Sequence, residues 1–441
     1  MKSLSPLIGC LLLACTTPTP PELPMQPTAP AVQLAEQPYL TLDRDTLYDK
    51  VLGLLVGSAI GDAMGAPTEM WSRYRIQLEY GYVDSLTDVT RGPSPEGTWT
   101  MNLPAGGTTD DTRWKYLLGT YYTQTAADWY AADGPDPYRF ASYLVDSYRA
   151  EIDALKRVDA FDPAPFELQA RRMAWLQEWA LVARPFAERD LEGYTYARDR
   201  FYGGEVTCAG MLYTPVVGVA YPGAPEHAYD AAYRLSLFDH GYARDISALT
   251  AAMVAGAFDP AATPESLLRL LRTVDMEHFF ESRLVGRSSY ELFTRSRAIV
   301  QYARRLEARD LANFHFRLPV KGRDSLRTAR LQHAYEALDR QNENRPFHAS
   351  EIQLIHLTAL QFCDFDFSCA MEFVTNYGRD NDTVAAVTGA LLGTYHGYAG
   401  LPEKLTRRVI SVNHDRLGID LEALATTITD ALLAQGAVRI R

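Results

Sequence analysis

The chain has 441 residues, of which 47% are hydrophobic and 22% charged, and its formal net charge at pH 7 is −12. This composition is typical of a globular protein and excludes an intrinsically disordered chain. The length allows one large domain or two ordinary ones. The negative charge argues against a broad nucleic-acid-binding surface, but not against an anionic substrate, because a bound metal ion reverses the local field.

The first 45 residues are expected to lie outside the folded domain. After Lys2, residues 4–13 form an apolar stretch that is too short to span a bilayer. The stretch ends in Leu-Leu-Ala-Cys, which resembles a bacterial lipobox and implies cleavage before Cys15 and lipidation of its thiol. An ordinary secretory signal is the alternative.

A segment rich in proline and threonine, residues 16–45, then follows and is typical of an extended tether. We therefore expect a signal peptide over residues 1–15, this tether, and one folded domain over residues 46–441. Only the lipid on Cys15 would attach the protein to a membrane. The expected location is the cell envelope, as a periplasmic or outer-membrane lipoprotein.

The first strong element covers residues 47–65, where apolar residues recur at helical spacing. A glycine every four residues costs such a helix about 1 kcal/mol each relative to alanine, so the repeat indicates close approach of another helix. A second glycine-edged helix is predicted to begin at Thr383. We expect the two helices to be central and to pack together; the alternative is that each packs against a different helix. The glycines concerned are Gly53, Gly57, Gly61 and Gly65 in the first, and Gly389, Gly393 and Gly397 in the second.

Helical periodicity also covers most of the remaining chain. Asp245 precedes a nearly all-apolar segment, residues 246–257, which predicts a capped and buried helix. Strand signals are sparse, so the sequence predicts an all-α fold in a single compact domain. The other expected elements are helices over 111–126, 137–156 and 166–188, charge-rich peripheral helices over 264–313 and 323–342, and loops over 195–225 and 314–322.

Three of the five cysteines fall in the predicted domain, at Cys208, Cys363 and Cys369. Their number and spacing fit no zinc-binding pattern. An oxidising compartment would permit a disulfide between Cys363 and Cys369, and buried free thiols are the alternative.

Two short acidic motifs lie far apart in the chain, and each opens an apolar helical pattern. Carboxylates are common at helix starts, where the helix dipole favours them, so ordinary caps are one interpretation. Clustered carboxylates also repel one another unless a cation lies among them, and hard oxygen donors are what Mg²⁺ and Mn²⁺ prefer. If the fold joins the two motifs, they predict a site for two ions. The first acidic motif is Thr109-Asp110-Asp111-Thr112, and the second is Asp380-Asn381-Asp382-Thr383.

Other catalytic motifs are missing from the sequence. It contains no phosphate-binding GxxxxGK[ST] loop, no HExxH and no GxSxG. The nine histidines are scattered, and His240 is the one that we expect to line a substrate site.

Together with the segment from Gly61 to Glu69, the two acidic motifs resemble the three signature motifs of the ADP-ribosylglycohydrolase family, which includes the dinitrogenase reductase-activating glycohydrolase. The resemblance spans residues 47–400. It implies an all-α fold with two Mg²⁺ or Mn²⁺ ions at the base of a cleft, and a catalytic role for Glu69 and Asp111. It leaves Asp62 as either a structural hydrogen-bond acceptor or a residue that supports the ligands. The implied metal ligands are Glu69, Thr109, Asp110, Asp111, Asp380, Asp382 and Thr383.

The activity that the resemblance implies is hydrolysis of an ADP-ribosyl or related ribosyl bond. The metal ions would orient the ribose diol and lower the pKa of a bound water, while a carboxylate moves a proton between water and leaving group. The expected partner is an ADP-ribosylated protein or a small ADP-ribosyl compound, with no nucleic acid, and the expected state is a monomer. The alternative is a non-catalytic protein, crystallin-like or an immunity or binding protein, that retains the fold and metal site.

Three departures from the family pattern concern the substrate side. Arg379 stands where the family often has glycine, and it would either contact a substrate phosphate or pair with a neighbouring carboxylate. Arg113 and Lys115 follow the first acidic motif, where acidic or apolar residues are usual. The family's glycine-asparagine-glycine stretch is not clear, and residues 203–211 are its nearest counterpart.

Overall fold

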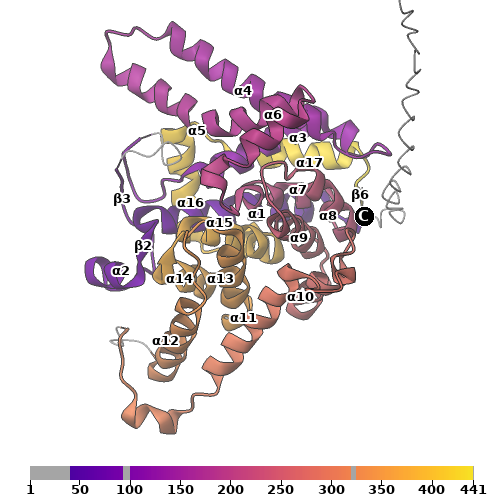
Figure 1. Ribbon diagram of the computed structural model, residues 1–441. Coiled ribbons are helices and arrows are strands. Elements are labelled where there is room, and N and C mark those ends of the chain that lie inside the picture. The colour runs from indigo at the N-terminus through magenta and orange to yellow at the C-terminus, as the bar shows by residue number, and fades with distance from the viewer. Residues whose placement is uncertain (1–39, 93–99, 319–323, 441) are drawn as a thin grey trace, which may run out of the picture. The chain divides into compact units, whose positions relative to one another are not determined.

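The computed structural model in Figure 1 describes residues 40–92, 100–318 and 324–440. The predicted signal peptide, Cys15 and most of the predicted tether lie outside the described residues. The described chain is all-α, as predicted, with only three small two-stranded ladders. The helices are α1 (Arg44–Gly65), α2 (Arg73–Tyr80), α3 (Asp110–Trp129), α4 (Pro137–Arg157), α5 (Pro163–Ala187), α6 (Leu191–Arg198), α7 (Thr214–Ala220), α8 (Pro225–Leu235), α9 (Tyr242–Ala257), α10 (Pro264–Thr273), α11 (Ser288–Arg304), α12 (Ser325–Asp339), α13 (Ala349–Phe362), α14 (Phe367–Tyr377), α15 (Asn381–His396), α16 (Glu403–Val412) and α17 (Leu421–Ala434).

The strands are short and join segments that are distant in sequence. The ladder β1–β6 is parallel, and the ladders β2–β5 and β3–β4 are antiparallel. Because β1 is paired and Asp43 caps α1, the folded domain begins a few residues before the expected end of the tether. The strands are β1 (Leu40–Leu42), β2 (Trp71–Ser72), β3 (Val89–Thr90), β4 (Asn102–Leu103), β5 (Gly378–Arg379) and β6 (Val438–Ile440).

The helices α1 and α15 lie side by side at the centre of the domain (Figure 1). A Cβ atom at Gly57 would lie 2.4 Å from the carbonyl oxygen of Gly389, and one at Gly61 would lie 2.1 Å from that of Ala385. No side chain fits in so small a space, so only glycine lets the two backbones approach this closely. The predicted pairing of the two glycine-edged helices is confirmed.

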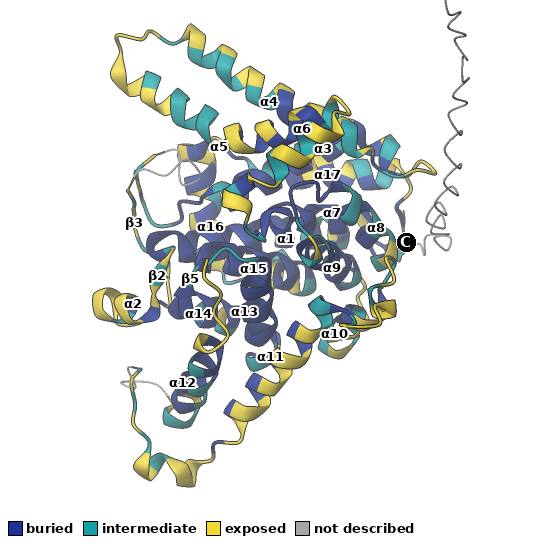
Figure 2. Cartoon of the chain, viewed as in Figure 1, coloured by how far each residue is buried: buried dark blue, intermediate teal, exposed yellow. Residues whose placement is uncertain are grey.

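The remaining helices cover this central pair. Helices α3, α16 and α17 pack on α1, whereas α9, α13 and α14 pack on α15. Figure 2 shows buried residues concentrated in these elements, while α4, α5 and α11 carry exposed outer faces. The segment Arg44–Thr68 is long and apolar enough to cross a membrane by composition, but its apolar window is wholly buried in the domain, as in a core helix.

The apolar helix predicted over 246–257 is present as α9 and is buried, but the predicted cap is wrong. The helix begins after Gly241, and Asp245 lies inside its first turn. Its carboxylate instead accepts two hydrogen bonds from Arg287, at 2.6 and 2.9 Å, and one from the hydroxyl of Tyr229 at 2.5 Å. A buried arginine partner, which sequence spacing does not reveal, decided the role of this carboxylate.

The loop predicted over 195–225 contains a helix that the sequence reading missed. Helix α7 lies within this segment, and all of its residues are buried. It is seven residues long and starts with a Thr-Pro pair. A segment this short offers too few turns for a helical period to stand out.

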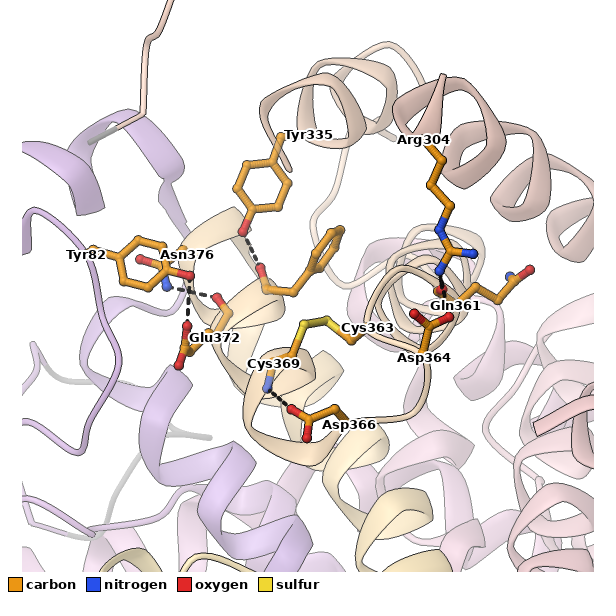
Figure 3. Close-up of a disulfide and its surroundings, with 11 residues drawn as sticks. Tyr82, Arg304, Tyr335, Gln361, Cys363, Asp364, Asp366, Cys369, Glu372 and Asn376 are labelled. Carbon is orange, nitrogen blue, oxygen red and sulfur yellow. Dashed lines mark hydrogen bonds and ion pairs between the residues drawn. A yellow bond between two sulfur atoms is a disulfide. The ribbon is translucent and has the colours of Figure 1, made fainter. Parts of the chain in front are cut away.

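The question left open for the cysteines is answered by a disulfide between Cys363 and Cys369 (Figure 3). The bridge joins the end of α13 to the start of α14 and spans Asp364 and Phe365, which both have positive φ angles. Cys208 is a buried free thiol. The bridge therefore anchors the helix that leads to the second acidic motif.

Candidate metal centre

The central helix pair brings the end of α1 to the start of α15. The short 3₁₀ turn Ala66–Thr68 follows α1 and leads to Glu69. The side-chain amide of Asn381 donates hydrogen bonds to the hydroxyl of Thr68, at 2.9 Å, and to a carbonyl of α14. A Cβ at Gly65 would lie 2.3 Å from the Cα of Asp382, so the close packing continues up to the second acidic motif.

Three carboxylates meet at this junction. Oxygen atoms of Glu69, Asp380 and Asp382 all lie within 4.8 Å of one another. Asp380 and Asp382 are buried, whereas Glu69 is partly exposed. Hard oxygen donors at this spacing suit a divalent cation such as Mg²⁺ or Mn²⁺.

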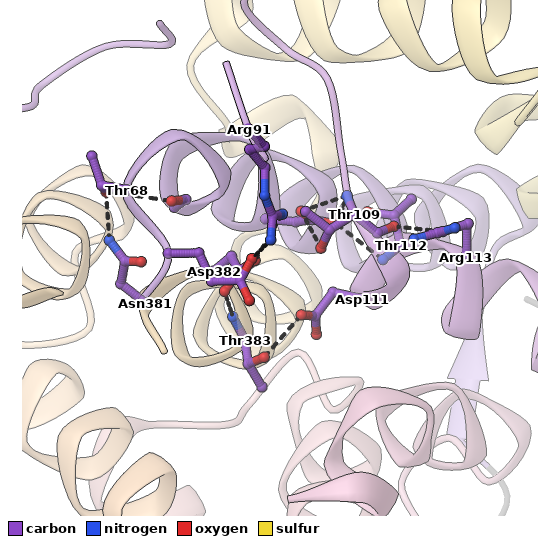
Figure 4. A network of polar contacts seen from close by, with 12 residues as sticks. Thr68, Arg91, Thr109, Asp111, Thr112, Arg113, Asn381, Asp382 and Thr383 are labelled. Carbon is purple, nitrogen blue, oxygen red and sulfur yellow. Dashed lines mark hydrogen bonds and ion pairs between the residues drawn. The ribbon is translucent and has the colours of Figure 1, made fainter. Parts of the chain in front are cut away.

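The first acidic motif reaches the same place from α3. The hydroxyl of Thr383 donates a hydrogen bond of 3.0 Å to the carboxylate of Asp111, and this bond joins the two motifs (Figure 4). The ammonium of Lys115 lies 3.4 Å from the other carboxylate oxygen of Asp111. The meeting of the two acidic motifs, on which the sequence prediction depended, is thus present.

Asp62 holds the first turn of α3 in place. Its buried carboxylate accepts hydrogen bonds from the backbone N–H and the hydroxyl of Thr109, at 2.9 and 3.0 Å, and from the same groups of Thr112, at 3.0 and 2.6 Å. Of the two roles left open for Asp62, the structure shows hydrogen-bond acceptance. An aspartate in the otherwise apolar last turns of a core helix was the signal for this role.

The electrostatics of the centre are those of crowded, buried carboxylates. Burial, helped by the charges of Asp111 and Asp382, raises the pKa of Asp62 to about 7. Burial also raises the pKa of Asp111 to about 6, although Lys115 opposes this shift. The pKa of Asp380 is well above its ordinary value because of burial and its neighbours, and the pKa of Asp382 is raised by burial despite the positive charge of Arg91. A divalent cation would stabilise all of these groups in their charged forms.

Arg91 is a residue of this centre that the sequence analysis missed. Its guanidinium forms an ion pair with Glu69, and its Nη1 atom lies 3.9 Å from a carboxylate oxygen of Asp382. It follows β3, far from any of the motifs. A lone arginine in an irregular segment carries no periodic or motif signal, so only the tertiary structure reveals it.

A small cavity of about 60 Å³ opens onto the carboxylates. Five of the seven predicted metal ligands line it, whereas Thr109 and Asp111 do not. The cavity is also lined by an aromatic wall that the sequence analysis missed, because most of it comes from irregular segments. The aromatic wall consists of Trp179, Tyr202 and Phe347. The predicted residues that line the cavity are Glu69, Asp110, Asp380, Asp382 and Thr383.

The two residues predicted to bind substrate have other partners. Arg379 pairs with Glu351 through two hydrogen bonds of 2.6 and 2.8 Å. Of the two alternatives considered for Arg379, the structure therefore shows pairing with a neighbouring carboxylate. The ring of His240 is hydrogen-bonded to the carbonyl oxygen of Arg198 at 2.9 Å. Within the described part of the chain, neither residue lines the cavity.

Fold and site together define an all-α protein with a buried carboxylate cluster suited to divalent cations. A family model described as ADP-ribosylglycohydrolase matches residues 43–437, and the chain therefore belongs to the ADP-ribosylglycohydrolase family, a family of glycoside hydrolases. The resemblance noted in the sequence is confirmed.

Two further comparisons found similar proteins. A solved structure titled ADP-ribosylglycohydrolase-related protein complex matches with a TM-score of 0.53 and 20% identity, over 88% of this chain and 99% of that one, which shows a shared fold. The uncharacterized protein YegU of Escherichia coli (strain K12) is 47% identical over 36 residues, which is 8% of this chain and 11% of that protein. The match therefore spans about a tenth of that relative's length.

Proposed function

We propose that this protein is a metal-dependent hydrolase that cleaves an ADP-ribosyl, or related ribosyl, glycosidic bond. The observation that carries the proposal is the meeting of both acidic motifs with Glu69 at one cavity. Membership of a glycoside hydrolase family supports hydrolysis of a glycosidic bond in general.

The donor set fits two Mg²⁺ or Mn²⁺ ions. All the expected ligand atoms are carboxylate or hydroxyl oxygens. Burial, together with the charges of neighbouring aspartates, raises the pKa values of Asp111 and Asp380, and a divalent cation would favour their charged forms. When bound, such ions polarise a water molecule and orient the ribose hydroxyls. The residues that would hold them are Glu69, Thr109, Asp110, Asp111, Asp380, Asp382 and Thr383.

The roles of the side chains follow from their contacts. Thr109 donates its hydroxyl hydrogen to Asp62, so the lone pairs of its oxygen stay available for an ion. Asp111 is oriented by Thr383 and Lys115, which suits a carboxylate that must keep one position. Glu69 lies at the cavity and is partly exposed, so it has access to solvent and is the candidate for moving a proton between water and leaving group.

The proposed location is the cell envelope, where a lipid on Cys15 would anchor a monomeric protein that acts on an ADP-ribosylated protein or a small ADP-ribosyl compound. The lipobox-like sequence supports this proposal, and so does the Cys363–Cys369 disulfide, since disulfides persist in oxidising compartments. Labelled palmitate should enter the wild-type protein in bacterial cells, and Cys15→Ser should abolish the incorporation.

The decisive experiment is a hydrolysis panel with Mg²⁺ or Mn²⁺ on ADP-ribosyl-arginine, ADP-ribosyl-serine, O-acetyl-ADP-ribose and simple nucleosides, with metal content measured on the same sample. We expect turnover by the wild type on at least one ADP-ribosyl compound. Asp110→Ala and Asp382→Ala should lose metal and turnover while keeping the unfolding profile of a folded protein. Asp146→Ala, an exposed carboxylate on α4, is the matched control and should keep both.

Two outcomes would overturn the proposal. Unchanged metal content in Asp110→Ala or Asp382→Ala would show that the substituted aspartate is not a metal ligand. Bound metal without turnover on any compound of the panel would favour the alternative of a non-catalytic binding or immunity protein.

A further inference from the structure

Arg91 reaches the acidic cluster from outside the helices that build it. Its backbone N–H donates to the carbonyl oxygen of Met101 at 3.1 Å, which extends the β3–β4 ladder by one bond and fixes the base of the side chain. From there the guanidinium points between the end of α1 and the start of α15 (Figure 4). Its side chain is 14% exposed.

The guanidinium contacts two of the three clustered carboxylates. Nη2 pairs with Oε2 of Glu69, and Nη1 lies 3.9 Å from Oδ2 of Asp382. Nη1 is buried and makes no hydrogen bond within the described residues. Arg91 is therefore held here mainly by charge, without the full set of hydrogen bonds that a structural arginine normally makes.

These are the carboxylates that the proposed metal site also needs. A carboxylate oxygen that accepts a hydrogen bond from a guanidinium has less charge to offer an ion, and two cations at contact distance repel each other. Arg91 and a divalent cation therefore exclude one another from the edge of the cluster that Glu69 and Asp382 form.

We propose that Arg91 is an internal counter-cation that competes with divalent cations for Glu69 and Asp382. The inference rests on the proposed metal site, and it adds that loading the site releases a guanidinium. Release frees Glu69, the residue to which we assign proton transfer, so that metal loading and activation of the centre become one event.

The structure has a place for the released side chain. A second cavity, of about 400 Å³, is also lined by Glu69, and Arg91 and Gly92 already form part of its wall. Arg75 lines the same cavity but is held 3.5 Å above the ring of Trp71 and makes no ion pair with the cluster in the described chain. Arg75 is therefore a matched control, because it lines the same cavity but forms no ion pair with these carboxylates within the described residues.

The test is calorimetric titration of the full chain with Mn²⁺ alone, without any substrate. Arg91→Gln should bind Mn²⁺ about tenfold more tightly than wild type, a change of about 1.4 kcal/mol. Arg75→Gln should match the wild type, and Arg91→Lys, which keeps the charge, should lie between the two. Arg91→Gln should also melt at a lower temperature than wild type after chelation and gain more in melting temperature on addition of Mn²⁺.

Unchanged or weaker Mn²⁺ binding by Arg91→Gln would overturn the inference, since a purely structural Arg91 would position Glu69 and its loss would weaken binding. If Arg91→Gln does not fold, Arg91→Lys replaces it: tighter Mn²⁺ binding than wild type supports the inference, and equal or weaker binding overturns it. The proposed function fails separately: tighter Mn²⁺ binding without hydrolysis of any compound keeps the inference and removes the function. Hydrolysis of a panel compound by the wild type, together with unchanged Mn²⁺ binding by Arg91→Gln, would keep the proposed function and remove the inference.

Discussion

The carboxylate side and the aromatic wall line one cavity but are built differently. The carboxylates stand at the ends of long buried helices whose backbones touch through glycine, and Asp62 and Asn381 tie those ends together. The aromatic wall comes from α5 and two irregular segments, one of which has Tyr202 at a φ of 47°. The difference suggests that the carboxylate side tolerates little change, whereas the aromatic wall has more freedom to vary.

Among the substitutions considered, one that breaks the close packing of α1 and α15 should reduce stability most. Gly61→Ala places a Cβ 2.1 Å from the carbonyl oxygen of Ala385, and backbone must move to accommodate it. We expect a loss of about 3 kcal/mol in the free energy of unfolding, measured by urea denaturation, together with loss of metal binding.

The control is Gly119→Ala in α3, where the new atom meets only side-chain ends of Leu424 and Ile428, at 3.0 Å or more. The free energy of unfolding of Gly119→Ala should fall by less than half as much as that of Gly61→Ala. Equal losses for Gly61→Ala and Gly119→Ala would mean that the close approach of α1 and α15 has no special weight.

Arg379 tests whether the second acidic motif is supported from its outer side. Arg379→Gln leaves the carboxylate of Glu351 buried without its charged partner, and we expect a loss of about 2 kcal/mol in the free energy of unfolding, reduced from the full buried-pair value because Arg379 is partly exposed. Arg345→Gln, which removes an exposed pair with Glu205, should change it by less than about 0.5 kcal/mol. A raised KM with unchanged stability in Arg379→Gln would instead favour the phosphate contact considered from the sequence.

The aromatic wall should affect substrate and not metal. Tyr202→Ala removes the ring that lies 5.8 Å, centroid to centroid, from Phe347, and we expect kcat/KM to fall about tenfold at unchanged Mn²⁺ affinity. Tyr196→Ala, an exposed tyrosine of α6, should leave both values unchanged. A drop in Mn²⁺ affinity in Tyr202→Ala would show that the wall and the carboxylates are not independent.

The last expected effect is a dependence of stability on pH. The pKa values of Asp62 and Asp111 are raised from 3.8 to about 7 and about 6, so the folded state binds more protons than the unfolded state between these values. Stability of the chelator-treated protein should therefore rise as pH falls from 7.5 towards 5, and Asp62→Asn should show a shallower slope. Saturating Mn²⁺ should flatten the profile, and a metal-independent slope in scanning calorimetry would contradict this account.

Much of the carboxylate side was predictable, because its signals are local. The glycine spacing predicted the α1–α15 pair, and the acidic motifs at two helix starts predicted where the carboxylates gather. Arg91 and the aromatic wall were not predictable, since each owes its position to packing between segments distant in sequence. For Asp245 the local signal was misleading. Its place at a helix start predicted a cap, but its carboxylate pairs with Arg287, which is distant in sequence.

By itself, the sequence determined the all-α class, the glycine-edged helix pair and the identity of the carboxylates, because helical period and residue chemistry are properties of short segments. Only the tertiary structure decided that Asp62 holds the first acidic motif, that Arg379 pairs with Glu351, and that Arg91 lies against Glu69 and Asp382. The physical reason is that these contacts join side chains from elements that meet only when the core packs, and no local pattern records which partner a buried charge will find.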